Sequence, residues 1–210
     1  MLKLIVFDCD GVLFDSREAN RSYYNDLLAA FGCGPMTEDQ LHYAHCHNVA
    51  DSVACIFKAH PHVDLKAVHR HRENLDYTPY LSSMVMEPDL VGFLEIVKEH
   101  FHLAISTNRT TTMAPLLETF GLTGYFELVV TSIDIAMPKP APDALFKIFD
   151  HFRCAPGQTI FIGDSEVDRQ HTVNAGVDLI AFRNRQLDAR YHVESFMEIL
   201  DLAPFAQVRP

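Results

Sequence analysis

The sequence predicts an α/β protein with a doubly wound parallel sheet and an all-helical insertion, and three observations carry this prediction. Short apolar runs alternate with segments of helical spacing through most of the chain. The first run, residues 4–7, has no polar face and is typical of a strand buried on both sides. Residues 16–80 contain no strand signal. Regular alternation of strands and helices is typical of a parallel sheet covered on both faces.

The individual elements follow from the spacing of apolar residues and from helix start and stop signals. Strands are predicted at residues 4–7, 103–106, 128–131, 159–162 and 179–182. Helices between and after the strands are predicted at residues 90–97, 113–120, 144–152, 167–175 and 193–200. Within residues 16–80, helices are predicted at 17–31, 49–58 and 65–75, and one opens at the capping box of Thr37 and Gln40.

This pattern divides the chain into two parts. We expect residues 1–15 and 81–210 to form a core domain and residues 16–80 to form a separate helical domain. The length of 210 residues allows one domain with an insertion.

Composition narrows the classes of partner. The net charge of −11 argues against a nucleic-acid polymer or an anionic membrane as the main partner, and no apolar run reaches membrane-spanning length. The five cysteines are odd in number and lack a CxxC spacing, which favours free thiols in a reducing compartment. Because a strand is predicted from residue 4 onward, we expect no signal peptide. We expect a cytoplasmic protein, monomeric or homodimeric, that acts on a small molecule.

Polar residues follow several predicted strands directly. Asp8 and Asp10 end the first strand, Thr107 and Asn108 the second, and Asp164 the fourth. Ligands of parallel sheets bind beyond the carboxyl ends of the strands. Residues i and i+2 of an extended chain point the same way, so Asp8 and Asp10 can converge on a divalent cation such as Mg²⁺. The alternative is an ordinary turn at a strand end.

Three further candidates join this set, each with a structural alternative. Thr107 can donate a hydrogen bond to an anionic oxygen, or it can cap the following helix. Lys139 lies among three prolines in a stiff loop that can hold its ammonium group in place, or it can be a solvated loop lysine. Asp168 lies one helical turn after Asp164, so both can face one site, or both can stabilise a helix N-terminus.

In this order, the candidates resemble the four motifs of the haloacid dehalogenase superfamily. The matching residues are Asp8-Cys9-Asp10-Gly11-Val12, then Thr107, then Lys139, then Gly163-Asp164 with Asp168. The resemblance covers nearly the whole chain. It implies a Rossmann-like core and a helical C1 cap at residues 16–80. The chain departs from the usual family pattern at His171 and Thr172, where small residues are common.

The resemblance also implies a role for each residue. Asp8 would be the nucleophile, and Asp10 would protonate the leaving oxygen and then activate water. The Asp8 side chain, the Asp10 backbone carbonyl and Asp164 would hold Mg²⁺, with Asp168 supporting the metal. Thr107, Asn108 and Lys139 would bind the phosphoryl group. Aspartate at position 10 is typical of family members that transfer phosphoryl groups.

The substrate is less closely defined. The pattern resembles the phosphoglycolate-phosphatase-like group, which implies a Mg²⁺-dependent phosphatase of a small phosphorylated metabolite. The alternatives are a sugar phosphomutase of the β-phosphoglucomutase type and a non-catalytic phosphometabolite-binding protein.

The sequence also does not decide which residues of the helical insertion contact the substrate. His45, His47 or Asn48 is a candidate, as are Arg17 and Arg21, although solvated histidines are the simpler interpretation. Residues 69–72 are expected on an exposed helical face.

Overall fold

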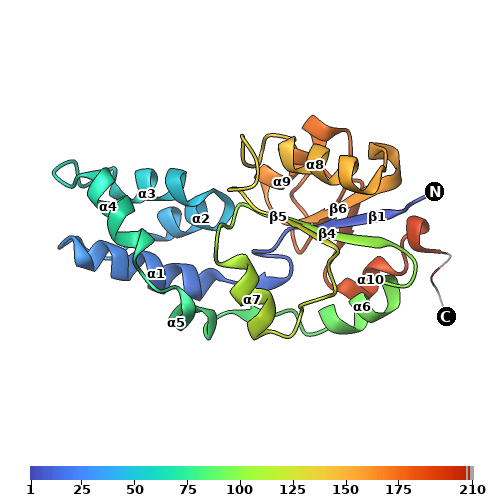
Figure 1. The fold of residues 1–210 in the computed structure, drawn as a ribbon, viewed down its shortest axis with the longest axis horizontal. Helices are drawn as coiled ribbons and strands as arrows, with labels where there is room; N and C mark the ends of the chain where they lie inside the picture. The colour runs from blue at the N-terminus through green and yellow to red at the C-terminus, as the bar shows by residue number, and fades with distance from the viewer. Residues whose placement is uncertain (207, 209–210) are drawn as a thin grey trace.

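The computed structural model describes residues 1–206 and residue 208, and it has the predicted α/β architecture (Figure 1). The strands are β1 (Leu4–Phe7), β2 (Phe14–Asp15), β3 (Val85–Met86), β4 (His102–Ser106), β5 (Leu128–Val130), β6 (Thr159–Gly163), β7 (Asp178–Phe182) and β8 (Tyr191–Val193). The helices are α1 (Arg17–Ala30), α2 (Glu38–Cys46), α3 (Val49–Phe57), α4 (Leu65–Glu73), α5 (Thr78–Leu81), α6 (Leu90–Val97), α7 (Met113–Thr119), α8 (Asp143–Phe152), α9 (Glu166–Ala175) and α10 (Phe196–Ile199).

Six strands form one parallel sheet in the order β5-β4-β1-β6-β7-β8. The central strand β1 pairs with β4 on one side and β6 on the other, where Leu4 lies opposite His102 and Thr159. All four residues of β1 are fully buried, as its unbroken apolar run predicts.

Helices cover both faces of the sheet, because successive residues of β1 point to opposite sides. Ile5 and Phe7 pack in one apolar cluster with residues of α6, α7 and α10. Leu4 and Val6 pack in a second cluster with residues of α8 and α9. Figure 1 shows these helices above and below the sheet. The sheet is therefore doubly wound, as predicted.

Helices α1 to α4 form a separate helical group beyond the carboxyl ends of the strands (Figure 1). They share an apolar cluster of their own, which includes Leu27, Leu41, Val53 and Phe57. The predicted capping box is present: Thr37 accepts a hydrogen bond from the Gln40 backbone, and the Gln40 side chain accepts one from Thr37. The division into two domains stays a prediction.

A short antiparallel ribbon joins the helical group to the sheet. Phe14 of β2 pairs with Met86 of β3, and Asp15 pairs with Val85. The ribbon was not predicted, because two-residue strands are too short to show a period of two.

The predicted helix at residues 193–200 is wrong at its start. Val193 belongs to strand β8, where it pairs with Phe182, and the helix begins at Phe196. Val193 and Phe196 are both buried and three residues apart, which imitates helical spacing. Among the described residues, no helix is both long enough and apolar enough to cross a membrane.

Candidate active site

The structure brings the predicted polar residues together beyond the carboxyl ends of β1, β4 and β6. A cavity of about 560 Å³ lies between this sheet edge and the helical group. Asp8, Asp10, Thr107, Asn108 and Lys139 all line it. The five residues come from three separate segments of the chain, so the parallel sheet is what assembles them.

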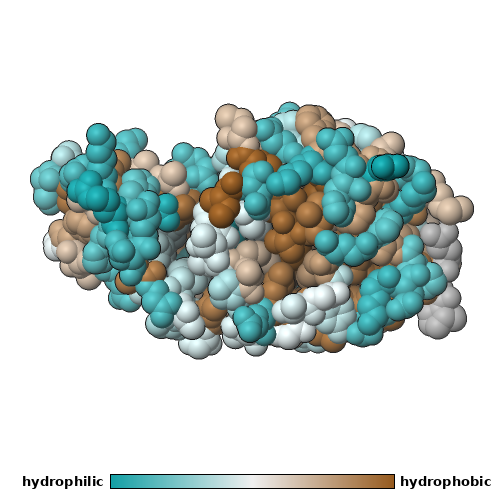
Figure 2. Space-filling view, in the orientation of Figure 1, coloured by the Kyte–Doolittle hydropathy of each residue, from teal (hydrophilic) through white to brown (hydrophobic). Residues whose placement is uncertain are grey.

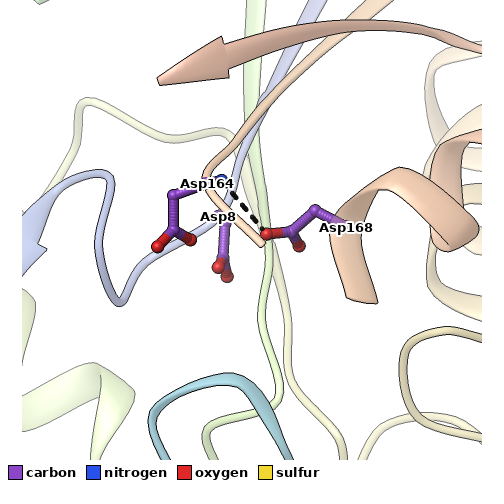
Figure 3. A group of neighbouring side chains, drawn as sticks. All are labelled: Asp8, Asp164 and Asp168. Atoms are coloured by element: carbon purple, nitrogen blue, oxygen red, sulfur yellow. Dashed lines mark hydrogen bonds between the residues drawn. The ribbon is translucent and has the colours of Figure 1, made fainter. Parts of the chain in front are cut away.

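Asp8, Asp164 and Asp168 lie side by side at the base of the site (Figure 3). One carboxylate oxygen from each lies within 4.8 Å of the others. Burial, reinforced by the charge of Asp168, raises the pKa of Asp8 to about 7 although Lys139 opposes this shift. Burial and the charges of Asp168 and Asp8 also raise the pKa of Asp164 well above its usual range. Burial and mutual repulsion therefore disfavour the ionised forms of Asp8 and Asp164 when no cation is bound.

The carboxylate of Asp168 is fully engaged with the protein. Its Oδ1 accepts a hydrogen bond from Lys139 Nζ at 2.6 Å. Its Oδ2 accepts bonds from the Ser165 hydroxyl at 2.7 Å and from the backbone N–H groups of Asp164 and Ser165. Burial opposes ionisation, but Lys139 and these hydrogen bonds lower the pKa of Asp168. Both carboxylate oxygens of Asp168 thus have protein partners, and Asp168 links Lys139 to the start of α9.

Asp164 differs, because no hydrogen bond from a described residue reaches its carboxylate. Gly11 makes room for this group. Its φ is +81°, and an added Cβ would collide with the Asp164 carboxylate. Asp8, which is buried, and Asp164, which is half-buried, are two close carboxylates with raised pKa values, and such a donor set suits a hard divalent cation.

Lys139 lies between two of the carboxylates. Its Nζ is 2.7 Å from Asp8 Oδ1 and 2.6 Å from Asp168 Oδ1. Burial disfavours the charged ammonium, but these two carboxylates outweigh it and raise the pKa of Lys139. Only 5% of the residue is exposed, so the interpretation as a solvated loop lysine is wrong.

A buried histidine holds the loop that carries Lys139. His171 Nδ1 lies 2.6 Å from the Ala141 carbonyl, and its Nε2 lies 3.1 Å from the Ser106 hydroxyl. Burial and the nearby Lys139 charge lower the pKa of His171 to about 4. We therefore assign a neutral ring whose Nδ1–H donates to Ala141 and whose Nε2 accepts from Ser106. His171, a departure from the family pattern, ties α9, β4 and the lysine loop together.

Sequence reasoning missed the partner of Asp10. Arg109 Nε donates to Asp10 Oδ2 at 2.8 Å, and Arg109 Nη2 donates to Oδ1 at 2.6 Å. Both side chains are largely buried. Burial works against ionisation, but the Arg109 charge and its hydrogen bonds lower the pKa of Asp10. The available signal was an arginine directly after Thr107-Asn108 at a strand end.

Thr107 and Asn108 lie at the end of β4 as predicted. Thr107 is 2% exposed, and its Oγ1 accepts from the Arg109 N–H at 3.1 Å, which leaves its own hydroxyl hydrogen for another acceptor. Asn108 Nδ2 donates to the Lys139 carbonyl at 3.2 Å, and Asn108 Oδ1 is buried with no partner in the described structure. Asn108 and His171 therefore both hold the lysine loop, at Lys139 and Ala141 respectively.

The helical group supplies the other wall of the cavity. His45 and His47 line it, whereas Asn48 caps α3 by accepting from two backbone N–H groups. Arg17 and Arg21 both form ion pairs with Glu38 instead of lining the cavity.

Residues 69–72 were expected on an exposed face, and for His69 and Arg72, which are both half-buried, this is wrong. Arg72 is half-buried and lines the cavity, while Arg70 and His71 are exposed. A four-residue run covers more than one turn of a helix, so its members must face different directions.

Comparisons with known sequences agree with this geometry. The chain matches the family model for haloacid dehalogenase-like hydrolases over residues 5–182. It is 28% identical over 206 residues to a phosphoglycolate phosphatase of Rhodobacter capsulatus, which covers 93% of both chains. It is also 39% identical over 75 residues to the phosphoglycolate phosphatase of Escherichia coli K12, which covers 35% of this chain and 30% of the relative.

Solved structures show the same fold. A subfamily IA hydrolase of the haloacid dehalogenase superfamily from Geobacter sulfurreducens superposes with a TM-score of 0.84 at 33% identity, covering 96% of this chain and 99% of the other. CbbY from Rhodobacter sphaeroides, solved with phosphate, superposes with a TM-score of 0.81 at 21% identity, covering 96% and 100%. The second likeness concerns the fold alone.

Proposed function

Since this chain belongs to the haloacid dehalogenase-like hydrolases and is a phosphatase of the phosphoglycolate-phosphatase-like type, we propose that it is Mg²⁺-dependent and hydrolyses a small phosphorylated metabolite through an aspartyl-phosphate. The observation that carries the proposal is the position of Asp8. It faces the cavity, Lys139 holds one of its oxygens, and its carboxylate lies beside that of Asp164.

In the first step, an Asp8 carboxylate oxygen attacks phosphorus. A new O–P bond forms as the bond between phosphorus and the ester oxygen breaks. Asp10 gives a proton to the leaving oxygen, so substrate binding must favour the protonated form of Asp10 that Arg109 disfavours in the free site. Lys139 and the hydroxyl of Thr107 offset negative charge on the phosphoryl oxygens.

In the second step, Asp10 acts as a base. It takes a proton from a water molecule, the water oxygen bonds to phosphorus, and the bond to Asp8 breaks. Inorganic phosphate leaves, and Asp8 returns to a free carboxylate. Asp10 thereby regains the proton it gave up in the first step.

The metal would be held by the side chains of Asp8 and Asp164 and by the backbone carbonyl of Asp10. Asp168 would support the metal or its water ligands. A bound Mg²⁺ supplies positive charge that orients the phosphate and offsets its negative charge. The raised pKa values of Asp8 and Asp164 support this proposal, because a divalent cation relieves the repulsion between them. We also propose that residues 16–80 act as a cap that limits water access to the reaction.

The relative from Rhodobacter capsulatus, similar over almost the whole chain, supports a phosphoglycolate-like ester as the substrate class. The two alternative functions, a phosphomutase and a binding protein, predict different results when turnover is measured. A phosphomutase would isomerise sugar phosphates faster than it releases phosphate. A binding protein would retain ligand without turnover.

A direct test uses p-nitrophenyl phosphate, a generic aryl ester. The purified protein should hydrolyse it with Mg²⁺ present, and EDTA should abolish the activity. Asp8→Asn should lose it as well, while Arg70→Gln, at an exposed residue that does not line the cavity, should retain it. Activity that survives Asp8→Asn would reject Asp8 as the nucleophile.

A further inference from the structure

Three permanently charged cations line the cavity: Lys139, Arg109 and Arg72. Two of them are offset by carboxylates of the sheet edge. Lys139 pairs with Asp8 and Asp168, and Arg109 uses two N–H groups on Asp10. Lys139 and Arg109 thus contribute little unpaired positive charge before substrate arrives.

Arg72 is the exception. No carboxylate of residues 1–206 or 208 lies within ion-pair distance of its guanidinium. The acidic neighbours that also line the cavity, Glu73 and Asp76, are exposed to solvent and make no ion pair with it. The guanidinium therefore brings an unpaired positive charge to the cavity wall.

Neutral partners hold Arg72 in place. Its Nε donates to His69 Nδ1 at 3.0 Å. It also interacts with the Tyr23 hydroxyl, whose pKa burial raises and Arg72 partly lowers. An arginine with a fixed Nε still presents its terminal N–H groups, which suit the two oxygens of a carboxylate or phosphate. Arg72 is thus oriented without being neutralised.

Two aromatic side chains connect Arg72 with Arg109, the partner of Asp10. Arg109 lies over the ring of Tyr77 at 5.7 Å, and the Tyr77 ring lies 5.1 Å from that of Tyr23, which neighbours Arg72. Two aromatic rings therefore lie between the cation that holds Asp10 and the cation of α4. The cavity of about 560 Å³ is in the size range of small-molecule pockets, so it has room for a phosphate ester with a second anionic group.

We propose that Arg72 binds a second anionic group of the substrate, so that the chain selects phosphate esters with a carboxylate or second phosphate several atoms from the scissile bond. This inference rests on the proposed phosphatase function and specifies its substrate class. The scissile phosphate meets Asp8, the carbon skeleton lies along Tyr77 and Tyr23, and the second anion meets Arg72.

The test is a binding measurement in the Asp8→Asn chain with Mg²⁺, so that turnover is not required. Two matched pairs of ligands separate the carboxylate from the phosphate. They are 4-carboxyphenyl phosphate against phenyl phosphate, and butane-1,4-diyl bisphosphate against 4-hydroxybutyl phosphate. In at least one pair, calorimetry should show that the ligand with two anionic groups binds roughly 10- to 100-fold more tightly than the ligand with one. This difference corresponds to the usual contribution of a charge-assisted hydrogen bond.

Adding Arg72→Gln should remove this preference and leave the affinity for phenyl phosphate within about twofold, because the lost contact is to the second anion alone. Arg72→Lys should restore part of it. Arg70→Gln, on the same helix with its side chain 68% exposed, should retain the full preference. In the active chain, Arg72→Gln should raise KM for the anionic ester and leave kcat unchanged.

Two results would overturn the proposal: equal affinity for both members of both pairs, or an equal loss for all four ligands on Arg72→Gln. Both differ from failure of the proposed function. In that case the unaltered protein would not hydrolyse p-nitrophenyl phosphate, whatever the calorimetry shows.

Discussion

At the residue scale, the partners of each aspartate set its chemistry. Asp168 and Asp10 are ionised because Lys139 and Arg109 hold them, while Asp8 and Asp164 are under-compensated and have raised pKa values. Four aspartates of one site thus fall into two classes. The two with raised pKa values, Asp8 and Asp164, are those whose side chains we propose as metal ligands.

The Arg109–Asp10 pair leads to a prediction about stability. The folded pKa of Asp10 is depressed, so the pair stabilises the protein above the usual carboxyl pKa and loses this effect as pH falls through the folded value. Arg109→Met should therefore lower the free energy of unfolding at pH 7 by about 3 kcal/mol, because it leaves a buried carboxylate unpaired. Urea denaturation measures this loss.

A double-mutant cycle provides the control. Asp10→Asn together with Arg109→Met should cost clearly less than the sum of the two single changes, since the unpaired charge is gone. If the two effects simply add, the ion pair does not contribute in the way described.

At the scale of elements, the turn that follows β1 requires a backbone conformation that favours glycine. The turn after β1 has Gly11 at φ +81°, beside the Asp164 carboxylate. Gly11→Ala should therefore displace that carboxylate and weaken Mg²⁺ binding strongly, by at least tenfold in the dissociation constant measured by calorimetry.

Gly32 provides a matched control for this change. It also has a positive φ, +69°, but an added Cβ would meet nothing within 4 Å. Gly32→Ala should cost about 1 kcal/mol of stability and leave Mg²⁺ affinity unchanged. Equal loss of Mg²⁺ affinity in both variants would show that backbone strain, not the Asp164 contact, is responsible.

His171, which links α9 to the Lys139 loop, should make the stability of the protein depend on pH. The folded pKa of His171 is lowered from 6.5 to about 4 by burial and by Lys139, with Asp168 opposing. Between these values the unfolded chain binds more protons. The free energy of unfolding should therefore fall by about 3 kcal/mol as pH drops from about 6.5 to about 4.

Urea denaturation of metal-free protein with chelator present, repeated at several pH values, measures this dependence. His171→Leu removes the titrating group, so its stability should vary less over the same range. An unchanged slope in His171→Leu would assign the pH dependence to other groups. His171→Leu should also lower kcat, because the loop that carries Lys139 loses its hydrogen bond to His171.

At the scale of the whole molecule, the helical group meets the sheet edge across the cavity. In Figure 2 the helical group at the left carries mostly hydrophilic side chains, and apolar side chains gather near its junction with the sheet. Arg72, which we propose selects the substrate, lies on α4 of the helical group, and Asp8, which we propose as the nucleophile, follows β1 of the sheet.

The sequence predicted the architecture well because buried strands and amphipathic helices have strong periods. The run at residues 4–7 and the helix at 166–175 needed only local information. The predicted site residues also converge, since strand ends of one parallel sheet share an edge.

Contacts between distant residues could not be predicted in this way. Arg109 meets Asp10 from 99 positions away, and His171 meets Ser106 from 65 away. Arg72 was assigned to an exposed face because a charged helical run gives no sign of which member turns inward. Strands β2 and β3 were missed because their pairing, not their composition, makes them strands.

The measurement that tests the proposed mechanism most directly is detection of a phosphorylated enzyme. The protein is mixed with a phosphate ester and Mg²⁺, quenched with acid within milliseconds to seconds, and digested for mass spectrometry. We predict a transient phosphate adduct on the peptide that contains Asp8, absent in Asp8→Asn and longer-lived when Asp10→Asn removes the base for the second step. Steady turnover of the ester with no adduct on that peptide at any quench time, or an adduct on another residue, would contradict Asp8 as the nucleophile.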